Sequence, residues 1–270
     1  MLKKRLIFTL LFDGGSFVLS RNFRPQKVGD LNWLLENYNF SKVAFYIDEL
    51  IILNITRNGE SLDEFSSALE QIAKNCFVPL SAGGGIRSIQ DAKKLLRFGA
   101  DKIVLNSLIF DDSKKVIELS REFGRQCLIA SLDFRRGADG SFQVYTEHAN
   151  RLVVYSFNEV FDLINRLGVG EVYLNSIDRD GTGQGYDLAV LNSLPNKSAL
   201  PIILAGGVGN SSHLMEGISD PRVAGVATAN LFNFVGNGLE KARKSILDQH
   251  VDLASWPDLS AIDLLERNND

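Results

Sequence analysis

The sequence predicts an α/β fold, a (β/α)8 TIM barrel built from two duplicated half-barrels. Short apolar segments alternate with amphipathic ones along the chain, which is the pattern of a parallel sheet with helical crossovers. One glycine stretch occurs twice, because an apolar strand runs into Gly83-Gly84-Gly85 in the first half and into Gly206-Gly207 in the second. A repeat at about half the chain length indicates an internal duplication, and the 270 residues match the roughly 250 typical of such barrels.

Eight strands and eight helices are expected in alternation. The strands are short apolar runs, expected at Arg5–Phe12, Glu49–Asn54, Val78–Ala82, Lys102–Asn106, Gln126–Asp133, Glu171–Ser176, Pro201–Ala205 and Val223–Ala229. The helices show apolar residues at helical spacing, near Leu31–Tyr38, Leu62–Asn75, Ile89–Phe98, Lys114–Phe123, Phe157–Leu167, Leu188–Ser193, Ser212–Ile218 and Leu239–Asp248. We therefore expect one barrel domain over residues 1–250. Residues 251–270, which include Trp256, are expected to form a tail docked on the surface, with a partner contact as the alternative role.

Two longer segments interrupt the regular alternation. Asp13–Gly29 follows the first expected strand, and Arg135–Tyr155 follows the fifth, where Phe142–Tyr145 has the pattern of a small hairpin arm. Both segments lie at the carboxyl ends of strands, the face on which barrels carry their chemistry.

The repeated glycines have the features of a phosphate cradle. Residues without a Cβ let consecutive N–H groups approach an anion, and a helix that starts just beyond adds the positive end of its dipole. Ser88 and Ser211 follow the two stretches and are expected to cap the helices. The alternative interpretation is a tight turn from strand to helix, but the occurrence of the pattern at equivalent places in both halves favours phosphate binding.

Composition excludes several classes of function. The net charge of −4, the isoelectric point near 5.5 and the absence of a basic stretch argue against nucleic acid as a partner. No apolar segment approaches the length of a membrane span. Cys76 and Cys127 are isolated, so we expect no disulfide framework and a cytoplasmic location. No cofactor and no metal site is expected.

Several motifs together resemble the cyclase subunit of imidazole glycerol phosphate synthase. The resemblance covers nearly all of the chain up to about Asp248, and the run Ser176-Ile-Asp-Arg-Asp-Gly-Thr182 is its most specific part. The other motifs are Met1–Arg5, Asn22-Phe23, Asp48–Leu50, Ala82–Ile86, Gly99–Lys102 and Gly206-Gly207. The resemblance implies a barrel that joins a glutaminase (HisH-type) subunit and receives ammonia through its core.

The resemblance also assigns residues to a gate and to a docking contact. A ring of charged residues at the N-terminal face of the barrel would gate the ammonia entrance, and its members correspond to Arg5, Glu49, Lys102 and Glu171. Two acids and two bases can neutralise one another where a lone buried charge would be costly. The alternative is that the ring only plugs the barrel. Asp101 would contact the glutaminase.

A phosphorylated small molecule would occupy the two cradles. By resemblance, the residues that bind its phosphates are Gly84, Gly85, Asn106 and Ser107 at one site and Gly206, Gly207, Ala229 and Asn230 at the other. The second set departs from the family, which usually has serine at the positions of Ala205 and Asn230. Ala205 leaves no side-chain donor in place of the serine hydroxyl, while the backbone donors remain.

The main departure lies in the first strand. The family carries two aspartates as general acid and base, at the ends of the first and fifth strands, and this chain keeps only Asp133. Leu11 stands where the other acid is expected, and leucine cannot transfer a proton. Asp13 is a candidate substitute two residues on, and Asp180 is carried over as a further catalytic candidate. A basic residue of the family is also missing, because Leu19 stands in its place.

Three hypotheses about function follow. In the first, the barrel receives ammonia from a glutaminase-like partner and channels it to another acceptor, as in the paralogous branch that resembles proteins supplying a separate amidotransferase for acetamidino groups on sugars. That branch would add a third subunit acting on a sugar. In the second, the chain is an active imidazole glycerol phosphate synthase cyclase of histidine biosynthesis, a lyase in which Asp13 or Asp133 carries the chemistry. The third is a phosphosugar isomerase or a phosphosugar-binding barrel.

Overall fold

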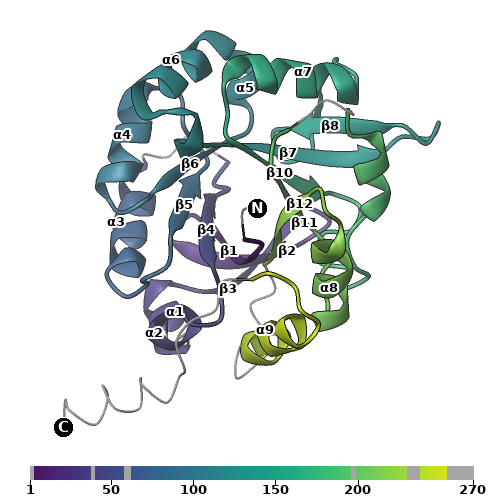
Figure 1. The fold of residues 1–270 in the computed structure, drawn as a ribbon. Helices are drawn as coiled ribbons and strands as arrows, with labels where there is room; N and C mark the ends of the chain where they lie inside the picture. Colours follow the sequence, from purple (N-terminus) through teal and green to yellow (C-terminus); the bar gives the residue numbers. More distant parts are fainter. Residues whose placement is uncertain (1–2, 38–39, 58–61, 196–198, 230–237, 254–270) are drawn as a thin grey trace, which may run out of the picture.

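The computed structural model is a closed barrel of parallel strands surrounded by helices, and Figure 1 views it with the strands inside the ring of helices. The structure describes residues 3–37, 40–57, 62–195, 199–229 and 238–253. The barrel strands are β1 (Arg5–Asp13), β4 (Glu49–Asn54), β5 (Leu80–Gly83), β6 (Lys102–Leu105), β7 (Leu128–Arg136), β10 (Glu171–Ser176), β11 (Ile202–Ala205) and β12 (Val223–Thr228). Each pairs in parallel with the next, and the β12–β1 pairing closes the ring. The predicted (β/α)8 fold is confirmed.

Helices cover the outside of the barrel. They are α1 (Leu31–Asn37), α2 (Phe40–Val43), α3 (Leu62–Ala73), α4 (Ile89–Arg97), α5 (Leu108–Asp111), α6 (Ser113–Phe123), α7 (Phe157–Leu167), α8 (Ser211–Ser219) and α9 (Gly238–Asp248). Short 3₁₀ helices span Arg125–Cys127 and Leu188–Ser193, and the second replaces an expected α-helix. Ser88 caps α4, as expected. The cap of α8 is Asn210 and not Ser211, because the Asn210 side chain accepts from the His213 N–H.

The strand pairings repeat in the two halves of the barrel with an offset of 122 residues. Ile7 pairs with Glu49 in the first half, and Ile129 pairs with Glu171 in the second. This offset makes Gly84, and not Gly83 at the start of the first glycine stretch, the counterpart of Gly206 at the start of the second. A register shift in the β11–β12 pairing accounts for an offset of 123 in the last strands.

The glycine contacts confirm this alignment. A Cβ on Gly84 would lie 1.9 Å from the carbonyl oxygen of Asn54, and one on Gly206 would lie 2.7 Å from that of Ser176. Both glycines also have positive φ angles, of 93° and 87°. Gly84 and Gly206 are therefore equivalent. Each lies where the chain passes so close to the end of the preceding strand that a Cβ would not fit, so glycine is required.

Two layers of apolar side chains form the core. The larger cluster lies between the strands and the helices, and Phe8, Phe65, Phe134 and Phe161 are among its largest fully buried members. The smaller cluster fills the barrel interior and consists of Ile7, Ile51, Val104, Ile129, Tyr173, Ile203, Ala205 and Ala227, with Leu53 packed against it. The lumen of the barrel is thus occupied by side chains over its middle.

The two long segments after β1 and β7 are antiparallel hairpins. The first contains β2 (Ser16–Arg21) and β3 (Arg24–Gly29), and β2 continues from β1. The second contains β8 (Phe142–Thr146), which pairs with the upper part of β7, and β9 (Arg151–Leu152). The expected hairpin arm is confirmed, and Figure 1 shows it projecting past the ring of helices. The expected end of the fifth strand at Asp133 was too early, because β7 continues to Arg136 in this arm.

The segment after α9 lies beside the residues that precede β1. The Lys4 N–H donates to the Asp252 carbonyl at 2.9 Å, and Lys4 forms a bridge with Leu253. Arg243 of α9 makes a buried two-bond ion pair with Asp48, at 2.8 and 3.0 Å. The rest of the predicted tail, with Trp256, lies outside the described residues, so its docking stays a prediction. Among the residues described, no helix is long and apolar enough to cross a membrane.

Candidate functional site

Asp133 lies at the C-terminal mouth of the barrel between two amide side chains. It belongs to β7 and is opposite Asn175 of β10 in the strand pairing. The amide groups of Asn175 and Asn106 each donate to one carboxylate oxygen of Asp133, both at 3.1 Å. Asn106 follows β6, so the carboxyl group is held from both neighbouring strands. The side chain stays partly exposed, which leaves it accessible to a molecule in the mouth.

The environment of Asp133 adjusts its proton affinity. The pKa of Asp133 is raised from its ordinary value to about 7: burial raises it most, the charge of Asp180 also raises it, and the hydrogen bonds from Asn175 and Asn106 lower it. A carboxyl group with such a pKa is present in both protonation states near neutral pH. It can therefore donate or accept a proton there, which is the property of a general acid or base.

The equivalent position in the first half-barrel is apolar. Leu11 of β1 lies opposite Leu53 of β4, whereas Asp133 lies opposite Asn175. The offset of 122 residues relates Leu11 to Asp133 and Leu53 to Asn175. The strand register thus places Leu11 at the position equivalent to Asp133, and this side of the mouth offers neither a carboxyl group nor an amide at these two positions.

Asp180 is hydrogen-bonded to the first hairpin, which contains β2 and β3. Its carboxylate accepts from the Ser20 hydroxyl at 2.5 Å and from the Phe23 N–H at 2.9 Å. Its carbonyl oxygen accepts from the Asn22 N–H at 3.0 Å. Burial raises the pKa of Asp180, and these side-chain and backbone hydrogen bonds lower it. Asp180 therefore joins the loop after β10 to the loop after β1 at the mouth.

Asp13 ends β1 and turns into the first hairpin. It pairs with Ser16 across the turn, and the next residue, Gly14, donates its N–H to the Thr56 hydroxyl at 2.9 Å. No hydrogen bond or ion pair from the Asp13 carboxylate to the described residues fixes its position. Asp13 and Asp133 are therefore held differently, since only the latter has two amide donors.

The two glycine stretches lie at the same end of the barrel as Asp133. They follow β5 and β11, whose carboxyl ends form the mouth. Within the part of the chain that the structure describes, the N–H groups of Gly84, Gly85, Gly206 and Gly207 donate to no protein acceptor. Two sets of available donors near a helix start can hold an anion. The close strand crossings nevertheless account for Gly84 and Gly206 without any ligand.

The remaining predicted phosphate ligands differ between the two sites. At the first, the Ser107 hydroxyl donates to the side-chain amide oxygen of Asn106 at 3.3 Å, while the Asn106 amide NH₂ group also donates to the Ser131 carbonyl at 3.0 Å. The amide group of Asn106 is thus already hydrogen-bonded to Asp133 and is not free to donate to a phosphate. At the second, Ala229 is half-buried after β12, and Asn230 lies outside the described residues.

The four predicted gate residues converge at the opposite end of the barrel. Each is the first residue of its strand. Arg5 Nη1 lies 2.6 Å from Glu49 Oε2 and 3.1 Å from Glu171 Oε2. Lys102 Nζ lies 3.2 and 3.4 Å from the same two atoms. Each base contacts both acids, so the ring compensates its own charge.

Arg5 is held in its charged form by the two acids of the ring, and Glu49 has a further partner in β5. Burial lowers the pKa of Arg5, but the hydrogen bonds and charges of Glu171 and Glu49 raise it by more. The Ser81 hydroxyl of β5 donates to Glu49 Oε1 at 2.5 Å. Ser81 therefore orients one acid of the ring, a contact that sequence reasoning did not identify.

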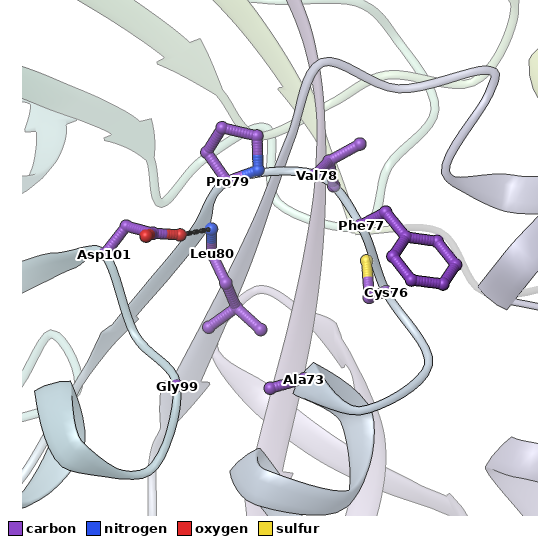
Figure 2. A pocket seen from close by; sticks show the side chains of 8 residues that line it. All are labelled: Ala73, Cys76, Phe77, Val78, Pro79, Leu80, Gly99 and Asp101. Atoms are coloured by element: carbon purple, nitrogen blue, oxygen red, sulfur yellow. Dashed lines mark hydrogen bonds between the residues drawn. The ribbon is translucent and has the colours of Figure 1, made fainter.

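A pocket of about 330 Å³ lies beside Asp101, at the same end of the barrel as the charged ring. Figure 2 shows Asp101 on one side of it and Phe77 on the other, with the Leu80 N–H donating to the Asp101 carboxylate at 2.8 Å. The Phe77 ring is 79% exposed. An exposed aromatic side chain and a carboxylate thus border the pocket at this end of the barrel.

Comparison with known proteins identifies the family of the barrel. A family model described as "Histidine biosynthesis protein" matches residues 27–236. The imidazole glycerol phosphate synthase subunit HisF of Streptococcus gordonii is 33% identical over 253 residues, which cover 91% of this chain and 96% of the relative. The chain belongs to the HisF family. A putative HisF2 subunit of that synthase from Parasynechococcus marenigrum is 44% identical, over 97% of both chains.

The HisF barrel thus has a charged ring at one end and a carboxyl group with two glycine loops at the other. Sequence reasoning found Asp133, the glycines and the ring, but it missed Asn175 as a hydrogen-bond donor to Asp133. The signal was present, because Asn175 ends a strand next to the one that ends in Asp133. The strand order of the barrel was needed to connect them.

Proposed function

We propose that this chain is the ammonia-receiving barrel subunit of a glutamine amidotransferase system. A glutaminase-like partner releases ammonia at the charged ring, and the barrel conducts it to the opposite mouth. The acceptor there differs from the cyclase substrate. The observation that carries the proposal is the combination of a complete ring of Arg5, Glu49, Lys102 and Glu171 with Leu11 at the equivalent of Asp133.

The loss of one carboxyl group affects ring closure more than ammonia transfer. A positioned acid or base contributes roughly 10²–10⁴ in rate, so a barrel with Leu11 loses most of a two-carboxylate reaction. Passage of ammonia needs no proton transfer from that position. We assign the use of the ammonia to a separate amidotransferase subunit, which acts on a sugar and forms acetamidino groups. The glycine loops would bind a phosphorylated small molecule.

The partner surface follows from the same geometry. Asp101 immediately precedes the ring residue Lys102, and the pocket with Phe77 adjoins it. A glutaminase-like subunit that covers this pocket would also cover the ring, so ammonia could enter the barrel without contact with solvent. Its matching surface would present an apolar side chain for the exposed Phe77 and a basic group for Asp101.

The second candidate is a cyclase that works with one paired carboxyl group. The pKa of Asp133 near 7 favours it, since that carboxyl group retains the properties of a general acid or base. Relatives from S. gordonii and from Streptococcus sanguinis (32% identical over 91% of this chain and 96% of the relative) are named HisF subunits of the synthase. In this candidate Asp13 would replace the missing acid.

An assay of the unmodified protein separates the two candidates. The cyclase substrate and ammonium are supplied without a glutaminase, and turnover is compared with that of a cyclase that has both aspartates. We expect turnover lower by roughly 10² or more, the loss of one acid or base. Ordinary turnover that disappears in Asp13→Asn would instead establish the cyclase and overturn the proposal.

A further inference from the structure

One polar contact crosses the middle of the barrel lumen. The hydroxyl groups of Tyr173 in β10 and Thr9 in β1 are 3.3 Å apart. Two strands, β11 and β12, separate β10 from β1, so this contact spans the interior and does not join neighbouring strands. Both residues are buried, with exposures of 4% and 1%. Tyr173 is also the only member of the interior cluster with a polar side chain, among the residues described.

The contact breaks the symmetry between the two half-barrels. Thr9 pairs with Ile51 in the first half, and Ser131 pairs with Tyr173 in the second. Ile51 and Tyr173 are therefore equivalent positions, both directed into the lumen. Where the first half places an aliphatic side chain, the second places a ring that reaches across to the opposite wall.

The position of Tyr173 lies between the charged ring and the mouth. Along β10, Glu171 belongs to the ring, Tyr173 lies two residues further, and Asn175 two residues beyond it holds Asp133. Two residues of a strand advance by about 6.6 Å, so a small molecule that leaves the ring meets the Tyr173–Thr9 contact before it reaches the mouth. The apolar neighbours Ile7, Ile51 and Ile203 carry no hydroxyl group.

We propose that the Tyr173 and Thr9 hydroxyl groups form a binding station for neutral ammonia, and that the Tyr173 ring is the internal constriction of the ammonia route. This inference rests on the proposed function, because it requires that ammonia travel from ring to mouth. Passage separates the two hydroxyl groups, and NH₃ then accepts a hydrogen bond from one and donates to the other. No covalent bond changes in this exchange.

The chemistry of the station suits ammonia and excludes ammonium. Burial raises the pKa of Tyr173 by more than its contact with Thr9 lowers it, so the phenol keeps its proton and remains both donor and acceptor. A neutral NH₃ can replace the existing hydrogen bond at little cost. An ammonium ion would be transferred into a lumen without a carboxylate at this level, and an unpaired buried charge is strongly unfavourable.

Isotope-labelled nitrogen sources test the proposal in the complete complex of the barrel with its glutaminase-like and acceptor-side partners. The measured quantity is the ¹⁵N transferred to the acceptor, first from amide-labelled glutamine and then from added ammonium, which reaches the mouth directly. The ratio of the two rates reports passage through the lumen. Tyr173→Phe removes a single oxygen atom, Thr9→Val removes the opposite hydroxyl, and Tyr173→Trp enlarges the ring.

We expect Tyr173→Phe and Thr9→Val each to lower the glutamine-to-ammonium ratio by about two- to tenfold, the range for one neutral hydrogen bond. Tyr173→Trp should lower it further, and ammonia lost to the medium should rise in step. The matched control is Tyr186→Phe, which removes another buried tyrosine hydroxyl, bound to the Ala227 carbonyl at 2.9 Å, and should leave the ratio unchanged.

The possible failures are distinguishable. A wild-type ratio in both Tyr173→Phe and Thr9→Val overturns the station while the ammonia route stands. Absence of transfer from glutamine in the unmodified complex, with transfer from ammonium intact, overturns the route and the station together. If Tyr173→Trp does not fold, the two hydroxyl deletions decide the question, since they keep nearly the same volume.

Discussion

Leu11 and Asp133 are equivalent residues of the two half-barrels, and each lies opposite a side chain that matches it. Leu11 pairs with Leu53, and Asp133 pairs with Asn175. The first half thus has an apolar pair where the second has a hydrogen-bonded one. This contrast indicates that the first half lacks both the acid and the amide that would support it.

Leu11→Asp should raise ammonium-dependent cyclase turnover above that of the unmodified protein, by up to about 10², because it restores a carboxyl group at the position equivalent to Asp133. The double variant Leu11→Asp/Leu53→Asn also supplies an amide and should gain more. Leu11→Asn is the matched control, since it is polar and cannot transfer a proton. Equal turnover of Leu11→Asp and Leu11→Asn would contradict the role of this position.

Asp133→Asn should stabilise the protein increasingly as the pH rises from about 4 to 7. The pKa of Asp133 is raised from 3.8 to about 7, so in this window the folded protein binds a proton that the unfolded chain does not, and the free energy of unfolding falls as pH increases. The full shift corresponds to about 4 kcal/mol, which partial exposure reduces to on the order of 1–3 kcal/mol.

Urea denaturation at pH 4 and pH 8 measures this difference. Asp178→Asn, the same change at an exposed aspartate paired with Arg135, is the control for effects of net charge. A difference between Asp133→Asn and the unmodified protein that does not vary with pH would show that the Asp133 carboxyl group titrates normally.

Phe77→Ser should weaken the complex with the glutaminase-like partner by about tenfold, because a buried aromatic residue commonly contributes more than 1 kcal/mol to an interface. Asp101→Lys should weaken it as well, by opposing a basic partner group. Asp101→Asn keeps an acceptor for the Leu80 N–H and removes only the charge. Titration calorimetry gives the affinities, and Val154→Ser, at a valine that is 91% exposed in the arm, is the control. Unchanged affinity of Phe77→Ser would place the interface elsewhere.

Ser107→Ala should lower the affinity for inorganic phosphate by about tenfold, since a hydrogen bond to a charged group is worth roughly 1.5 kcal/mol or more. Ser113→Ala, whose hydroxyl donates to the Ile109 carbonyl, is the matched control. Substitution of Gly84 is less informative, because any Cβ would collide with the Asn54 carbonyl oxygen. Phosphate binding that is unaffected by Ser107→Ala would assign the first glycine loop a purely structural role.

The sequence predicted the order of the strands along the chain, because apolar runs can be recognised without knowledge of contacts. It also predicted that Leu11 occupies the expected position of the missing acid, because that position can be counted from Arg5 within one strand. It misjudged the cap of α8, since Asn210 and Ser211 are both good caps and only backbone geometry distinguishes them. The segment Leu188–Ser193 has a helical pattern, but it forms a 3₁₀ helix, a geometry common in short helical segments.

Contacts across the barrel were the least predictable part of the site. Thr9 and Tyr173 meet only because the sheet closes and directs alternate side chains inward. Sequence spacing gives the parity of each residue but not its partner on another strand. The amide donors of Asp133 were missed for the same reason.

The bridge between Lys4 and Leu253 has a consequence for chain connectivity. Because the two ends of the barrel meet and β12 pairs with β1, each of the eight barrel strands has two neighbours in the ring and none depends on where the polypeptide begins. A new start at Gly124, between α6 and β7, with the old ends joined, would leave all the strand pairings in place. In such a circular permutant the half that carries Asp133 would be synthesised first, and the half that carries Leu11 would have to close against it.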